Sequence, residues 1–163
     1  GHDAQGSVLR LTLLKAGMAP DEKVDRGEHR FTYALYLHEG PCGAQTDRMA
    51  ARLNHPLRLT CAAAPQEAYS LMSCDNPNVT IDAVKRSEAG DHSIIVHLHE
   101  LGNTHANTRL QPGFPVEKCV LCTLMEEETA PAATDGKSVS LSFHPFEIKI
   151  LRLWPARDTE VAQ

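Results

Sequence analysis

The chain has 163 residues, a hydrophobic fraction of 42% and a net charge of −5 from 16 basic and 21 acidic side chains. A chain of this size and ordinary composition buries enough surface to fold without disulfides or a metal. No basic run is longer than Lys85-Arg86 and no apolar run approaches the length of a membrane span, which argues against nucleic acid or a membrane as a partner.

Three features concern the cellular compartment and the processing of the chain rather than its fold. Five cysteines, an odd number at irregular spacing, are typical of free thiols in a reducing compartment, so we expect a cytoplasmic protein. The start, Gly1-His2-Asp3, resembles the remnant of a cleaved purification tag, and we expect residues 1–6 to be a disordered start. Asn78-Val79-Thr80 is a glycosylation sequon that matters only in a secreted protein, and we interpret it as the start of a strand.

Strands and one helix are predicted in the first part of the chain. Ser7–Leu14 has the branched and apolar content of a strand, and Glu28–Leu37 is apolar on both sides, which favours a central strand. Ala44–Leu53, with apolar residues at helical spacing, is the one convincing helix. Leu57–Cys61 is a short strand, and a lobe boundary is expected near residues 61–69, although the alanines there also suit a helix.

The best-specified local structure is Asn78–Leu101, where two runs alternate with period two around a polar turn. Gly90 supplies the backbone freedom that this turn needs. Further strands are expected at residues 103–111, 116–125, 138–143 and 146–153, with a mobile hairpin connection at 126–137 and a frayed tail at 155–163. The pattern predicts an all-β, antiparallel β-sandwich over residues 7–154, in one or two lobes, with one short helix around 44–53.

Histidines and cysteines offer two candidate sites. His97 and His99 lie on one side of one predicted strand and are the weak candidates for metal ligands, but zinc needs further ligands and none stands at a diagnostic spacing. The alternative is a polar, solvent-facing side of the strand. Cys119 and Cys122 have the C-x-x-C spacing, but positions i and i+3 of a strand face opposite sides, so the two sulfurs diverge.

The carboxylates form no recognisable catalytic pair. Residues 126–128, three consecutive glutamates, are interpreted as a solvated loop. Asp82 and Glu147 are expected to face water or to pair with Lys85 or Lys149. The residues by themselves therefore predict a β-sandwich with no catalytic, cofactor-binding or metal site.

Three stretches together resemble the C-terminal β region of the glycoside hydrolase family 38 α-mannosidases, with the cytosolic-type branch as the nearest likeness. The first is Leu9–Gly40, with its RLTLL and GEHRFTYALY strands. The second is Val79–Glu100, which together with the preceding Asn78 reads NVTIDAVKRSE…IIVHLHE. The third is Val139–Leu153, which contains LSFHPFEIKILRL. Their order is preserved across most of the chain. His97 and His99 stand where the family pattern has Arg and Tyr, which argues against a family-wide metal role for them.

The resemblance implies a much longer parent enzyme, an α-mannosidase that cleaves terminal α-mannosides with retention and with the help of zinc. The family's nucleophile and zinc ligands belong to a barrel domain, and no position of this sequence matches those motifs. The chain is therefore expected to be a non-catalytic C-terminal domain, inactive alone and without bound zinc. Its expected partners are the other domains of the parent and the mannose-containing substrate, and the isolated chain is expected to self-associate.

A free-standing carbohydrate-binding or protein-interaction module is the alternative. Such modules commonly stack sugars on exposed aromatic rings. Aromatic residues make up only 5% of this chain, and Trp154 is the single large candidate for such stacking.

Overall fold

The structure is a computed structural model that describes residues 1–61 and 67–156. The chain divides into two compact units, Gly1–His38 and Glu39–Gln163. The boundary expected near 61–69 includes residues 62–66, and the tail expected at 155–163 includes residues 157–163; both segments lie outside the described residues.

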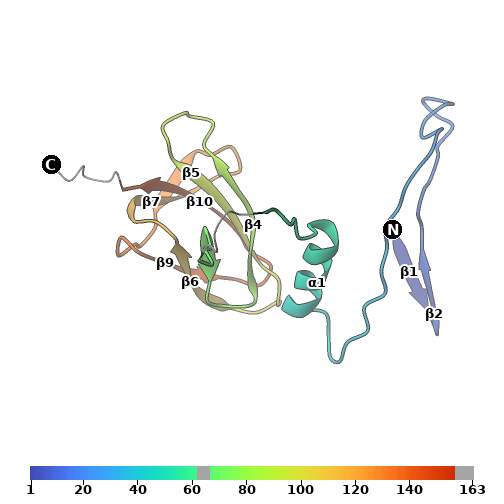
Figure 1. The fold of residues 1–163 in the computed structure, drawn as a ribbon, viewed down its shortest axis with the longest axis horizontal. Coiled ribbons are helices and arrows are strands. Elements are labelled where there is room, and N and C mark those ends of the chain that lie inside the picture. The colour runs from blue at the N-terminus through green and yellow to red at the C-terminus, as the bar shows by residue number, and fades with distance from the viewer. Residues whose placement is uncertain (62–66, 157–163) are drawn as a thin grey trace. The chain divides into compact units, whose positions relative to one another are not determined.

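The first unit contains one antiparallel hairpin, formed by β1 (His2–Gln5) and β2 (Val8–Leu11) (Figure 1). The expectation of a disordered start is wrong, because the backbone of β1 is paired with β2 from His2↔Leu11 to Gln5↔Val8. The strand predicted at Ser7–Leu14 is confirmed over the residues of β2. Both strands are exposed along their whole length.

The central strand predicted at Glu28–Leu37 is wrong: these residues form no strand in the structure. Tyr33, Leu35 and Leu37 are 68%, 75% and 83% exposed. The physical reason is that a strand exists only where its backbone groups pair with a neighbouring strand. Within Gly1–His38 the described strand pairing is limited to β1 and β2, so the backbone of Glu28–Leu37 has no described strand to pair with. The short strand predicted at Leu57–Cys61 is wrong for the same reason.

The second unit begins with the helix α1 (Ala44–Asn54), which confirms the prediction. Its first turn is closed by Thr46 Oγ1, which accepts a hydrogen bond from the Gly43 backbone N–H at 3.4 Å. It ends where the His55 N–H donates to the Ala51 carbonyl at 2.7 Å, directly before Pro56, which disfavours a helical residue ahead of it. None of its residues is buried. Among the described residues no helix has the length and apolar character needed to cross a bilayer.

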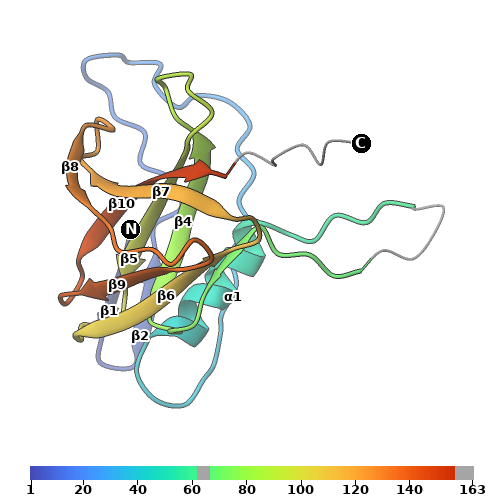
Figure 2. The ribbon, with the colours of Figure 1, turned by 90° about the vertical axis from the view of Figure 1, so that its left-hand side faces the viewer.

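The remaining strands form two antiparallel sheets that face each other (Figure 1, Figure 2). The larger sheet has the order β4-β5-β10-β7-β8, formed by Val79–Arg86, Ile94–Glu100, Ile148–Pro155, Val116–Cys122 and Glu128–Pro131. The smaller sheet has the order β3-β6-β9, formed by Met72–Cys74, Ala106–Pro112 and Val139–Phe143. The predicted all-β antiparallel sandwich with one short helix is confirmed. The expected connection at 126–137 differs in containing β8.

The core lies between the two sheets and is built by alternate residues of their strands. Leu98, Leu151 and Leu153 from the larger sheet and Leu110 and Val139 from the smaller one have no exposed surface. Because successive residues of a strand point to opposite faces, the neighbours of these residues point away from this core.

The hairpin predicted at Asn78–Leu101 is confirmed as β4 and β5, with one difference in its alternation. The register shifts between Ile81 and Ala83, which pair with the consecutive residues Leu98 and His97. Asp82 is therefore the extra residue of a β-bulge. Beyond it, Val84 rather than Ala83 continues the side of Ile81.

Candidate functional site

The two histidines singled out from the sequence lie on the outer side of β5. His99 Nδ1 is 2.7 Å from Asp82 Oδ2, an ion pair when the ring is protonated. Asp82, which was expected to face water or to pair with Lys85 or Lys149, is exposed and pairs with a histidine, because the bulge places it beside His99. Across residues 1–61 and 67–156, no three His, Cys, Asp or Glu side chains gather as a metal site would require. The side chains present do not fit a zinc ion.

Cys119 and Cys122 take opposite sides of β7, as the strand geometry predicted. Cys119 is buried opposite core residue Leu153, whereas Cys122 lies opposite Ile150 and is half-buried. Burial raises the pKa of the Cys119 thiol to about 12 and also raises the pKa of Cys122. Since the thiolate is the reactive form, this burial makes both thiols less reactive.

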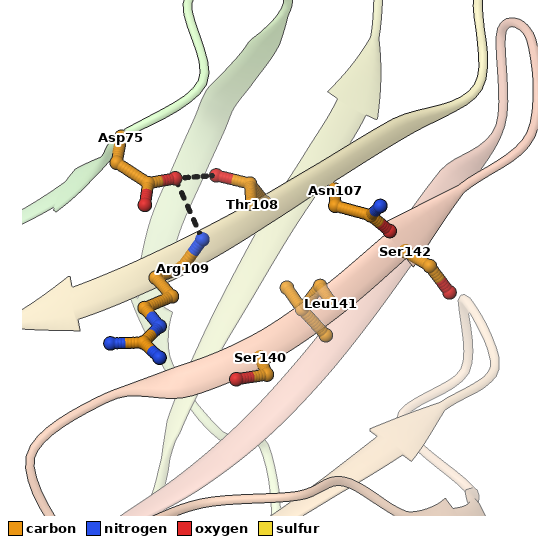
Figure 3. Close-up of a pocket in the computed structure, with 7 residues that line it drawn as sticks. All are labelled: Asp75, Asn107, Thr108, Arg109, Ser140, Leu141 and Ser142. Atoms are coloured by element: carbon orange, nitrogen blue, oxygen red, sulfur yellow. Dashed lines mark hydrogen bonds between the residues drawn. The ribbon is translucent and has the colours of Figure 1, made fainter.

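A polar cavity of about 450 Å³ opens on the solvent side of the smaller sheet (Figure 3). Its carboxylate, Asp75, accepts hydrogen bonds through Oδ1 from the Thr108 hydroxyl at 2.9 Å and from the Arg109 N–H at 2.8 Å. The backbone hydrogen bond from Arg109, followed by that from Thr108, holds the pKa of Asp75 below its usual range. The remaining lining consists of Asn107, Ser140, Leu141 and Ser142. Such a set can hydrogen-bond hydroxyl groups.

A second cluster fixes the one tryptophan. Asp91 Oδ2 accepts hydrogen bonds from Arg152 Nη2 at 2.8 Å and from Trp154 Nε1 at 3.0 Å. Hydrogen bonding from Ser93 is the main reason that the pKa of Asp91 lies well below its usual range. Lys118 Nζ and the Arg152 guanidinium carbon lie 4.2 Å and 4.9 Å from the centre of the Trp154 ring. These cation–π contacts occupy the ring that a sugar-stacking role would use.

Sequence reasoning missed Glu100, a carboxylate with no exposed surface at the end of β5. Its Oε1 accepts from the Gly102 N–H at 2.7 Å and from the Thr104 hydroxyl at 3.1 Å, and its Oε2 accepts from the Phe146 N–H at 3.0 Å. Burial opposes its ionisation, but these hydrogen bonds outweigh burial and keep the pKa of Glu100 low. The available signal was the alternation itself, since Glu100 shares a side with Val96 and Leu98.

The space around Glu100 leaves little room for a side chain at position 102. A Cβ there would lie 2.9 Å from Glu100 Oε1 and 2.6 Å from Asn78 Nδ2. Such distances are shorter than non-bonded atoms allow. The Asn78 side chain, part of the sequon, therefore packs at the start of β4, in line with its interpretation as a strand start.

Glu126 was expected in a solvated loop, and that expectation is wrong. Its side chain is only 10% exposed and lies 2.7 Å from Lys85 Nζ. The same carboxylate accepts from the Ser87 hydroxyl and the Glu88 N–H, each at 2.9 Å. The hydrogen bond from Lys85 is the main cause that lowers the pKa of Glu126 to about 2. The turn before β8 is thereby tied to the β4–β5 turn.

These carboxylates have structural roles in the second unit. Glu147 pairs with Lys149 at 2.7 Å, as predicted. The described residues define a scaffold, and an open polar cavity lies on its smaller sheet.

The chain was compared with known families and proteins. Residues 78–149 match the family model of the glycosyl hydrolases family 38 C-terminal beta sandwich domain. The chain is 34% identical over 160 residues to alpha-mannosidase 2C1 of Homo sapiens, covering 94% of this chain and 15% of that protein. It is 36% identical over 177 residues to alpha-mannosidase of Saccharomyces cerevisiae, covering 94% of this chain and 16% of the relative.

The β-sandwich thus resembles a class of C-terminal domains found in glycoside hydrolases. Residues 78–149 match the C-terminal β-sandwich domain of family 38, and the chain is similar to α-mannosidases over 94% of its length, which confirms the resemblance noted in the sequence. The chain spans about 15% of the length of the 2C1 relatives.

Proposed function

We propose that this chain is the non-catalytic C-terminal domain of a longer α-mannosidase, and that the parent enzyme hydrolyses terminal α-mannosides. The observation that carries the proposal is the similarity to α-mannosidases over 94% of the chain. The great length of those relatives leaves room for separate catalytic domains.

The chemistry is assigned to those other domains. Retaining hydrolysis needs two carboxyl groups about 5 Å apart across the scissile bond. Glu100 and Glu126 instead accept hydrogen bonds from their own fold. Zinc, when bound in the parent, would supply a positive charge for the sugar hydroxyls, and the described residues of this chain do not fit it.

The proposed partners and cellular compartment follow from the assignment to a longer α-mannosidase and from the cysteines. The partners are the remaining domains of the parent and its mannose-containing oligosaccharide substrate. We place the enzyme in the cytoplasm, which is supported by the free state of all five cysteines.

The experiment is hydrolysis of an aryl α-mannoside by the purified 163-residue chain. The expected result is no release of the aryl group above the buffer rate at any zinc concentration. Release that co-purifies with the chain and disappears in the Asp75→Asn variant would overturn the proposal, because it would place a catalytic carboxylate in this domain.

The polar cavity at Asp75 and Arg109 favours one second function, binding of a carbohydrate without hydrolysis. Titration of the chain with mannose, followed by NMR shifts of the Asn107–Arg109 amides, measures it. Millimolar or tighter binding that is lost in Arg109→Ala would support a carbohydrate-binding module, and unchanged spectra would exclude it.

A further inference from the structure

The segment Phe31–Leu37, FTYALYL, combines strand-forming side chains with an exposed position. It has no charged residue, and apolar side chains occupy both of its alternating sides. Tyr33, Leu35 and Leu37 are at least two-thirds exposed. Side chains of this kind on both faces are typical of a strand inside a sheet that is covered on both sides.

In the sandwich of the same chain, the two edge strands of the larger sheet carry features that stop them from pairing with other chains. The edge strand β4 carries Asp82, Lys85 and Arg86 together with a bulge. The other edge of that sheet, β8, is four residues long and contains Glu128 and Pro131. Charges, bulges, proline and short length are the devices that stop an edge from pairing with other chains.

Phe31–Leu37 has none of these devices. A neutral, apolar, strand-forming segment of seven residues in water is an aggregation hazard. The absence of protection is understandable if the segment is covered in the protein that normally contains it.

The rest of that longer protein is the partner that would cover Phe31–Leu37. The matches to α-mannosidases include 94% of this chain but only about 15% of each 2C1 relative, so most of the polypeptide that surrounds this segment in those proteins lies outside the chain.

We propose that Glu28–Leu37 is an interdomain strand: an inner strand of a β-sheet whose other strands belong to another domain of the same longer enzyme. Backbone hydrogen bonds to two neighbouring strands would hold it, and its two apolar faces would enter that domain's core. The proposal rests on the proposed function, since it requires the chain to be part of a longer protein. It adds the segment by which the accessory domain is anchored.

Backbone amide exchange measured by mass spectrometry tests the interdomain strand. In the 163-residue chain, peptides covering residues 28–37 should exchange as fast as unstructured peptides, whereas those covering β5 should be protected. In the full-length protein, exchange of residues 28–37 should slow by at least about tenfold. Equal, fast exchange in both proteins would overturn the proposal, and so would protection that rises with the concentration of the full-length protein, which would indicate a second copy.

Matched substitutions supply the control. Leu35 and Leu124 are 75% and 73% exposed in the structure, and Leu124 lies in the turn before β8. Leu35→Asp should abolish the protection of residues 28–37 in the full-length protein, and Leu124→Asp should leave it unchanged. If both variants retain the protection, the segment is not buried in a sheet and the proposal fails.

These outcomes are distinguishable from failure of the proposed function. Exchange protection does not depend on hydrolysis, so an inactive full-length protein with protected residues 28–37 would contradict the α-mannosidase assignment and support the interdomain strand.

Discussion

The Glu100 side chain connects the end of β5 to the turn before β10. Its three hydrogen-bond donors, from Gly102, Thr104 and Phe146, all point at a fully buried carboxylate. Charge-assisted hydrogen bonds of this kind are stronger than neutral ones. The cluster therefore fixes the geometry at one end of the larger sheet.

Replacement of this carboxylate should destabilise the second unit. Glu100→Gln removes the charge and turns an N–H₂ group towards backbone donors, so Tm should fall by roughly 5 °C. Glu117→Gln, on the exposed side of β7, is the control and should leave Tm unchanged. Thermal unfolding by circular dichroism makes the comparison, and equal Tm values for the two variants would contradict the assigned role of Glu100.

The Glu126–Lys85 pair gives the domain a defined acid sensitivity. The folded pKa of about 2 lies below the ordinary value of 4.5. The native state therefore binds the proton less readily than the unfolded state, and the stabilisation is complete above pH 4.5 and lost as pH falls towards 2. Urea unfolding between pH 6 and 2 should show a shallower loss of stability in Glu126→Gln than in the wild type. Parallel pH profiles would show that the pair contributes nothing.

The solvent side of β5 could be predicted from residues alone, because His97 and His99 alternate with buried apolar neighbours. The side on which Glu100 lies follows from the same alternation, but its partner Phe146 is far away in sequence and could not be predicted. Burial of Glu126 could not be predicted either, because it depends on Lys85, which is also far away in sequence.

At the scale of elements, the hairpin of β4 and β5 differs from Glu28–Leu37 in having its partners within the chain. Both segments have a strand-like pattern of side chains. The pattern in Asn78–Leu101 folds because its two halves pair with each other across a short turn. The pattern in Glu28–Leu37 predicts a strand just as clearly, but sequence alone does not reveal which strand would pair with it.

This difference should appear in the energetics of the isolated chain. Leu98 has no exposed surface, whereas Leu35 is 75% exposed. Leu98→Ala should lower the free energy of unfolding by about 2–5 kcal/mol, and Leu35→Ala should change it by less than about 0.5 kcal/mol. Denaturation in urea measures both. A large effect of Leu35→Ala would mean that residue 35 is already packed within this chain.

For the whole molecule, the exposed apolar residues of Gly1–His38 have a consequence in solution. Leu35, Leu37 and the hairpin residue Leu9 are 75%, 83% and 64% exposed. Removal of this surface from water favours association. Light scattering should show a mass that increases with concentration for the 163-residue chain, and less so for Leu35→Asp. A monomer at high concentration would contradict this expectation.

The assignment of zinc and catalysis to other domains is tested most directly in the full-length enzyme with His97 and His99 both changed to alanine. The variant should retain the wild-type zinc content, kcat and KM on an aryl α-mannoside, because these side chains lie on the outer side of β5 and Asp82 is paired with His99. Loss of zinc, or a fall in kcat of about a hundredfold or more with the fold intact, would place the active centre in this domain and contradict its accessory role.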